Sequence, residues 1–170
     1  DNMLGYNGTF GDIDVSLAYV NGGTGTSGGG SSDTSWVVQY NGLMDGLTLG
    51  IGMGENGSTQ DLQTVYAKYT QGSVTVGYQI SEVDNTGATA DEESTHIAAS
   101  IAVNENLSIS AGRFEVDMGA GKVDEESNGF SASYTVGSTT IGFVANSTDN
   151  VAGTSGSDDS YREIAVSFAF

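Results

Sequence analysis

Apolar residues recur at every second position along most of this chain, and this alternation limits its possible folds more than any other feature. In the segment 73–80, Val74, Val76, Tyr78 and Ile80 alternate with threonine, glycine and glutamine. Successive side chains of a β-strand point to opposite faces of a sheet, whereas a helix has a period of about 3.6 residues. No segment shows a convincing helical period, so the sequence predicts an all-β fold.

The alternating segments number about eleven, and short and long connections join them in turn. We expect strands at 2–10, 13–20, 34–41, 47–55, 61–71, 73–82, 94–103, 106–117, 128–136, 139–148 and 160–170. The tight connection Gln71-Gly72, for example, is followed by the long polar connection 82–93. Tight turns at one end and long loops at the other are typical of an up-and-down antiparallel sheet.

The residues between the apolar positions distinguish a membrane barrel from a soluble sandwich. They are mainly Gly, Ser, Thr, Ala and Gln, whereas a solvated outer face usually carries lysine and glutamate. Charges gather in the long loops, in clusters such as 91–93, 124–126 and 158–159. Aromatic residues fall near strand ends on the apolar parity, like the girdles of a membrane barrel. The sequence therefore predicts a transmembrane up-and-down β-barrel whose apolar face meets lipid and whose polar face lines a lumen.

Composition supports this interpretation and excludes several classes of protein. The chain lacks proline, which would remove a donor from a ladder, and lacks cysteine, which excludes disulfides and thiol nucleophiles. Its 170 residues carry 4 basic and 22 acidic side chains, a formal charge of -18 that argues against a nucleic-acid partner. No apolar run of about 18 residues occurs, so we expect no membrane-spanning helix. No leader precedes Asp1, and we interpret the chain as a mature or truncated product.

The end of the chain, 161–170, resembles the terminal strand of bacterial outer-membrane barrels. Ile164, Val166, Phe168 and the C-terminal Phe170 share one parity there. In that family this strand is the targeting signal that the barrel-assembly machinery reads. The resemblance therefore assigns these four residues to an assembly signal.

The segment 5–19 resembles a strand, a turn and a strand of Gram-negative general porins, closest to the alphaproteobacterial type. The resemblance covers essentially the whole chain. Such porins have roughly 16 strands, and single-chain bacterial barrels have even strand counts. We therefore expect residues 1–170 to form a single β-barrel domain, the C-terminal portion of a 16-stranded barrel. A complete barrel of about ten or twelve strands is the alternative.

The resemblance implies an outer-membrane porin, through whose water-filled pore small hydrophilic solutes and ions diffuse passively. It also implies a homotrimer, outer-membrane lipid and lipopolysaccharide as partners, and N-terminal barrel strands that are missing here. Parity places the following residues on the lumen side: Asp14, Ser16, Gln39, Thr48, Tyr66, Lys68, Thr75, Gln79, His96, Ser100, Ser131, Ser133, Thr135, Asn146, Tyr161 and Glu163.

Two other functions remain as alternatives to a porin. A smaller outer-membrane β-barrel enzyme of the lipase or protease type would need a catalytic constellation, and His96 is the only histidine. Ser94 and Ser100 lie near it in sequence, but neighbours on one strand do not make a triad, and no orienting acid is evident. We expect no catalytic site. A soluble β-rich surface adhesin module is the other alternative.

The acidic loops are weak candidates for binding Ca²⁺, which takes about six to eight oxygen ligands. The candidate residues are Asp84, Asp91, Glu92, Glu93, Asp124, Glu125 and Glu126. Their spacing does not match an EF-hand. Divalent ions that bridge these carboxylates to lipopolysaccharide phosphates are a second possibility, and no other cofactor is expected.

One charge conflicts with the parity of its strand. Leu107, Ile109 and Ala111 lie on the apolar parity, and continued alternation would place Arg113 in lipid. An exposed arginine near the middle of a bilayer costs about 2–4 kcal/mol.

A β-bulge near Gly112 would remove this conflict, because one extra residue switches the faces of a strand. We therefore predict a bulge that turns Arg113 and Glu115 to the lumen and Phe114 and Val116 to lipid. The alternative is that Arg113 stays outward, against a neighbouring protomer.

Overall fold

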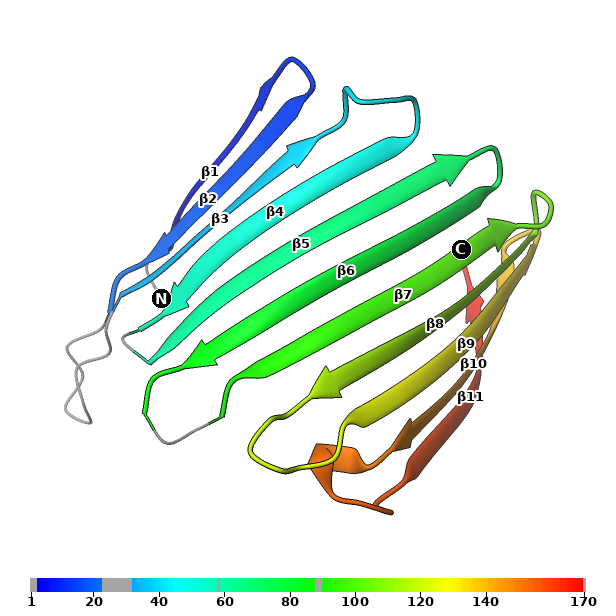
Figure 1. Cartoon of the computed structure of the whole chain (residues 1–170). Coiled ribbons are helices and arrows are strands. Elements are labelled where there is room, and N and C mark those ends of the chain that lie inside the picture. Colours follow the sequence, from blue (N-terminus) through cyan, green and yellow to red (C-terminus); the bar gives the residue numbers. More distant parts are fainter. Residues whose placement is uncertain (1–2, 23–31, 58, 88–89, 170) are drawn as a thin grey trace. The chain divides into compact units, whose positions relative to one another are not determined.

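Eleven β-strands follow one another in chain order through a single sheet, so each strand lies next to its neighbours in sequence (Figure 1). The computed structural model describes residues 3–22, 32–57, 59–87 and 90–169. The strands are β1 (Met3–Phe10), β2 (Ile13–Val20), β3 (Asp33–Tyr40), β4 (Leu47–Asn56), β5 (Gln60–Gln71), β6 (Val74–Asn85), β7 (Glu92–Ala102), β8 (Leu107–Asp117), β9 (Glu125–Val136), β10 (Thr139–Asp149) and β11 (Asp159–Phe168). The predicted all-β, up-and-down antiparallel arrangement of eleven strands is confirmed.

The predicted strands match the observed ones closely, except where strands continue into acidic segments. Glu92 and Glu93 lie in β7, and Glu125 and Glu126 lie in β9, although the sequence pattern predicts loops for all four. The backbone ladder continues here beyond the apolar part of each strand, because hydrogen bonding between strands does not depend on apolar side chains.

Contacts divide the chain into two compact units. Unit 1 comprises Asp1–Lys68 and Gln79–Glu93, and unit 2 comprises Tyr69–Tyr78 and Ser94–Phe170.

The tight turns depend on glycine at positions that other residues rarely adopt. In unit 1, Gly11 joins β1 to β2 with a φ of 64°, and in unit 2, Gly137 joins β9 to β10 with a φ of 59°. These left-handed conformations carry no steric penalty for glycine. The turns fix the registers Phe10↔Ile13 and Val136↔Thr139, and thereby the face of each following residue.

The described part of the chain has almost no conventional core. Val116, with 7% of its surface exposed, is the only buried hydrophobic residue among the residues described. Large apolar side chains lie open along one face of each unit, for example Ile51 at 41% exposure in unit 1 and Phe168 at 60% in unit 2. We call this the apolar face and the opposite one the polar face. Exposed apolar surface of this extent requires an apolar environment or a partner.

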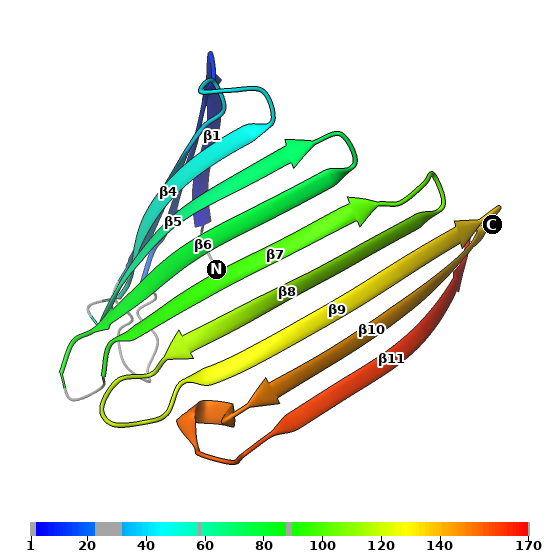
Figure 2. The ribbon, with the colours of Figure 1, turned by 45° about the vertical axis from the view of Figure 1, so that its right-hand side comes forward.

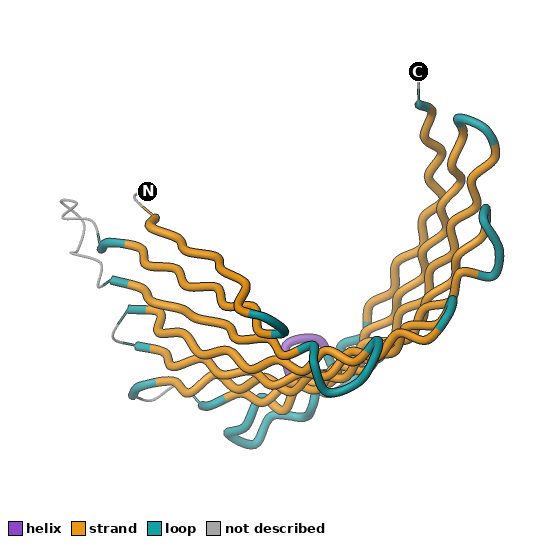
Figure 3. The backbone as a smooth tube through the Cα atoms, turned by 90° about the horizontal axis from the view of Figure 1, so that it is seen from above, coloured by secondary structure: helices purple, strands orange, loops and turns teal. Residues whose placement is uncertain are grey.

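Helical structure is limited to one short turn within the described residues. Val151–Gly153 forms a 3-10 turn in the connection between β10 and β11, purple in Figure 3. No helix in this part of the chain is long and apolar enough to cross a membrane. Figure 2 shows β9, β10 and β11 side by side, and the registers pair them residue by residue.

Candidate functional site

The polar face of unit 1 carries side chains that hydrogen-bond to one another across strands. Asp14 accepts hydrogen bonds from Thr9 Oγ1 at 2.7 Å and from Asn41 Nδ2 at 2.9 Å. Thr48 Oγ1 donates to Asn41 Oδ1 at 2.8 Å, which extends the network to β4. The network is exposed, so its unused donors and acceptors are available to water.

A second network on the polar face of unit 1 joins β5 and β6. Gln79 Nε2 donates to Thr64 Oγ1 at 3.0 Å, and Thr64 and Ser81 hydroxyls lie 2.8 Å apart. Beside it, the ring of Tyr66 lies over Gly50, where a Cβ on the glycine would come within 2.2 Å of the ring. Neutral amides and hydroxyls therefore dominate this surface.

The polar face of unit 2 repeats this chemistry with pairs of hydroxyl groups. Four such pairs join neighbouring strands, with oxygens 2.7–3.0 Å apart: Thr70 with Thr75, Ser110 with Ser131, Ser127 with Thr148, and Thr135 with Thr140. Each hydroxyl can still accept or donate a further bond. These hydroxyl pairs can bind water, and they add no charge to the polar face.

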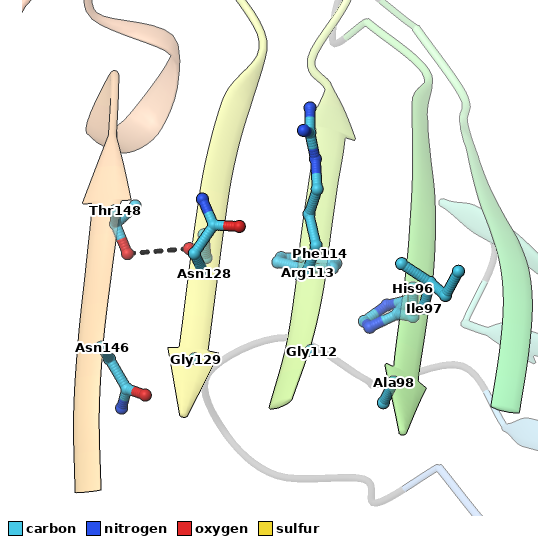
Figure 4. Close-up of a pocket in the computed structure, with 11 residues that line it drawn as sticks. His96, Ile97, Ala98, Gly112, Arg113, Phe114, Asn128, Gly129, Asn146 and Thr148 are labelled. Carbon is cyan, nitrogen blue, oxygen red and sulfur yellow. Dashed lines mark hydrogen bonds between the residues drawn. The ribbon is translucent and has the colours of Figure 1, made fainter. Parts of the chain in front are cut away.

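A pocket of about 380 Å³ opens on the polar face of unit 2 (Figure 4). Gly112 and Gly129, paired directly across β8 and β9, form its floor. His96 and Phe114 stand on one side, with ring centroids 4.2 Å apart and planes at 34°. Asn146 of β10 stands on the other side. The structure thus brings together residues from four consecutive strands.

The predicted bulge near Gly112 is wrong. The register of β8 and β9 runs one to one through the segment, as Ala111↔Phe130, Gly112↔Gly129 and Arg113↔Asn128. Arg113 and Glu115 consequently share the apolar face with Leu107, opposite to Ser131 and Ser133. Phe114 and Val116, expected to face lipid, lie on the polar face instead.

Neighbouring carboxylates explain how Arg113 is accommodated on the apolar face. Its guanidinium lies 2.8 Å from Glu115 Oε2 and 2.6 Å from Glu126 Oε2. Asn128 Nδ2 donates to the other Glu126 oxygen at 3.0 Å. The arginine therefore lies on the apolar face with its charge paired, although about half of its side-chain surface is exposed (49%).

Replacing Arg113 is expected to destabilise the folded protein. Glu115 and Glu126 are direct cross-strand partners, and like charges in that position repel. Arg113→Gln should lower the thermal unfolding temperature in detergent, and adding Glu126→Gln should restore most of the loss. Arg162→Gln is the matched control, since Arg162 makes no ion pair within the described residues. An equal effect of both arginine variants would contradict this account.

Several of the other predicted lumen residues lie on the polar faces of their units. Cross-strand registers place Asp14 beside Gln39, and Asn146 beside Tyr161. Sequence reasoning missed the pocket because it assigned Phe114 to the opposite face. Simple alternation from Ser108 and Ser110, continued without the bulge, would have found it.

The candidate calcium ligands do not gather into a metal site. In the described ranges, no group of three or more His, Asp or Glu side chains is arranged to hold a metal ion. Several of these carboxylates bind the backbone instead: Asp91 Oδ1 accepts from Asn85 N at 2.8 Å, and Glu125 Oε2 accepts from Ala152 N at 2.7 Å. Glu126 is paired with Arg113.

The residues assigned to the assembly signal line one face of β11. Ile164, Val166 and Phe168 are 72%, 53% and 60% exposed. They pair across β10 with Phe143, Ile141 and Thr139 in that order. Phe170 lies outside the described residues.

Comparison with known proteins identifies one matching family, and the similar solved structures share one fold. Residues 1–170 match the family model described as Gram-negative porin. No match was found among curated proteins.

Three solved structures illustrate the shared fold. The anion-selective porin from Comamonas acidovorans has a TM-score of 0.81 and 15% identity, and the match covers 100% of this chain and 60% of that one. Pseudomonas aeruginosa OccK3 (OpdO) has a TM-score of 0.80 and 14% identity, covering 99% and 58%. Salmonella typhi OmpF, solved with daunomycin, has a TM-score of 0.72 and 12% identity, covering 96% and 60%. The chain therefore spans about 60% of the length of these solved proteins.

Proposed function

Because the chain belongs to the family of Gram-negative porins, we propose that it lines a water-filled pore for the passive diffusion of small hydrophilic solutes and ions. Membership in this family confirms the predicted family and the location in the bacterial outer membrane. It identifies a channel rather than an enzyme, and it does not favour the lipase-like or protease-like barrel or the soluble adhesin.

The contrast between the two faces of the sheet is the observation that supports this function. The apolar face exposes large side chains, which lipid would cover, and the polar face carries neutral hydrogen-bonding groups, which water would cover. In a closed barrel every backbone donor is satisfied within the sheet, so lipid is excluded from the interior. Diffusion through such a pore needs no catalytic group.

The proposed pore wall consists of the predicted lumen residues that share the polar faces. Arg113 and Glu115 are withdrawn from this set. The remaining members are Asp14, Ser16, Gln39, Thr48, Tyr66, Lys68, Thr75, Gln79, His96, Ser100, Ser131, Ser133, Thr135, Asn146, Tyr161 and Glu163.

The assembly of the whole protein is also part of the proposal. Since the chain spans about 60% of the solved porins that it matches, further strands would complete the barrel. A homotrimer in contact with lipopolysaccharide is the assembly that family membership favours. Divalent ions would bridge acidic side chains of the protein to the phosphates of lipopolysaccharide.

Spin labelling tests which face meets lipid. The residues expected to point away from the pore axis are Leu47, Leu49, Ile51, Val74, Val76, Ile97, Ile101, Ile141, Phe143, Val166 and Phe168. In vesicles, nitroxide labels at Val76 and Phe168 should be accessible to oxygen and shielded from a water-soluble nickel reagent. Labels at the adjacent Thr75 and Ser167 are matched controls and should show the reverse. Nickel access at both Val76 and Phe168 would refute the membrane orientation.

The acidic charge predicts a preference for cations. The chain has a formal charge of -18, and a negative potential at a pore mouth concentrates cations. The reversal potential across a bilayer in a KCl gradient should have the sign of a cation-preferring channel. The preference should decrease as salt rises, because screening shortens to about 3 Å at 1 M. Lys68→Gln should strengthen the preference and Glu163→Gln should weaken it. A reversal potential of the opposite sign would contradict this prediction.

A further inference from the structure

We infer that the pocket on the polar face of unit 2 binds neutral, ring-shaped solutes with several hydroxyl groups, of which monosaccharides are the simplest. The inference rests on the proposed function, since a pore would bring solutes past this face.

The floor of the pocket exists because two glycines face each other across β8 and β9. A Cβ on Gly112 would lie 3.1 Å from the carbonyl oxygen of Ile97 and 3.2 Å from the Cβ of Ala98. A Cβ on Gly129 would lie 3.0 Å from Asn146 Oδ1. Side chains here would fill the hollow, so the glycines leave a flat patch of backbone open to a solute. The volume of about 380 Å³ lies within the range of about 300–1,000 Å³ usual for small-molecule sites.

One wall of the pocket is aromatic. The rings of His96 and Phe114 contact each other and border the floor together, and Phe114 is half-buried (Figure 4). An aromatic ring carries negative charge on its faces and offers a large apolar surface. The C–H face of a sugar ring, which is apolar and slightly positive, can pack against such a surface.

The opposite wall supplies hydrogen bonds. Asn146 lines this side, and its amide offers two donors and one carbonyl acceptor. Ser127 and Thr148 hydroxyls lie 2.7 Å apart and keep further capacity. A polyol that rests its apolar face on the aromatic wall can therefore direct hydroxyl groups to this side.

The charges around the pocket favour a neutral solute. Arg113 borders the pocket, but its guanidinium is paired with Glu115 and Glu126 on the apolar face. The side chains that line the pocket on the polar face are glycine, alanine, serine, threonine, asparagine, phenylalanine and one histidine. None of them is a carboxylate, an ammonium or a guanidinium group.

Solute-induced current noise tests the inference in the purified protein reconstituted in planar lipid bilayers. D-glucose should increase the noise of the open-channel current in a saturable way. Sorbitol, which has similar hydroxyl groups but no ring, should act much more weakly. Phe114→Ala should raise the apparent Kd for glucose about tenfold and Asn146→Leu about fivefold. Gly129→Val, which fills the floor, should abolish the saturable response.

The matched control is Phe143→Ala, which removes a phenylalanine from the apolar face of the adjacent strand β10 and should leave the glucose response unchanged. Conducting channels whose glucose affinity is unaffected by Phe114→Ala and Asn146→Leu would overturn the inference. An equal response to sorbitol would overturn the assignment to ring-shaped solutes. A wild-type protein that forms no channel would instead overturn the proposed function.

Discussion

Gly50→Val is expected to destabilise the folded protein by about 1 kcal/mol, the low end of the effect of overpacking, because the displaced group is a side chain and not the backbone. A Cβ at Gly50 would lie 2.2, 2.3 and 2.6 Å from three atoms of the Tyr66 side chain. Real Cβ atoms do not approach other atoms so closely, so the ring must leave its place over the glycine. Urea unfolding of the protein in detergent micelles measures the loss as a shift of the midpoint.

Gly142→Val is the matched control for this experiment. Gly142 also lies on a polar face, opposite Ser133, and a Cβ at this position would have no atom within 4 Å. Valine is favoured in strands, so this variant should be neutral or slightly stabilising. Adding Tyr66→Ala to Gly50→Val should recover most of the lost stability, because the two side chains compete for one space. Equal destabilisation by both glycine variants would show that loss of backbone freedom, rather than the ring, is responsible.

Deleting Phe170 is expected to remove most of the protein from the outer membrane. The resemblance of the C-terminal strand assigns Phe170 to the assembly signal, and the three preceding members of that set lie exposed along one face of β11. Another protein can bind these exposed apolar side chains before the sheet is complete. The measurement is the amount of protein in the outer-membrane fraction, relative to total protein, for both forms.

Refolding separates the signal from a general loss of stability. The deleted form should refold from urea into detergent almost as well as the wild type, because it lacks a single terminal residue and keeps all eleven strands. Phe143→Ser is the control, because it replaces an aromatic residue of the same apolar face that is not part of the assembly signal. This variant should reach the outer membrane normally. If the deletion leaves the outer-membrane fraction unchanged, Phe170 has no role in targeting.

Much of the fold can be predicted from parity alone. A side chain that meets lipid and one that meets water must alternate in a strand, so the pattern at Val74, Val76 and Tyr78 leaves little choice of structure. The same rule assigns Gln79 and Thr75 to the polar face, where their hydrogen bonds are found. The position of a strand, and the face of the sheet to which each of its side chains points, can thus be predicted from the local sequence.

The ends of the strands and the surroundings of Arg113 cannot be predicted from the local sequence, because they depend on residues of neighbouring strands. The sequence pattern predicts that β9 starts at 128, because Glu125 and Glu126 resemble loop residues, whereas the strand begins at Glu125. Glu126 therefore lies directly across from Glu115 and next to Arg113. Without that partner the arginine requires a bulge, so one misplaced boundary leads to the wrong faces for Phe114 and Val116.

The pairing of each strand only with its neighbours in sequence has a consequence for the chain before it folds. Its apolar side chains are interleaved with polar ones, so the extended chain presents no apolar run of the roughly 18 residues that a membrane-spanning helix needs. A coherent apolar surface arises only when hairpins form and align every second residue. The chain can therefore cross an aqueous compartment as a dispersed polymer. It becomes compatible with lipid only as its strands pair with their neighbours in sequence.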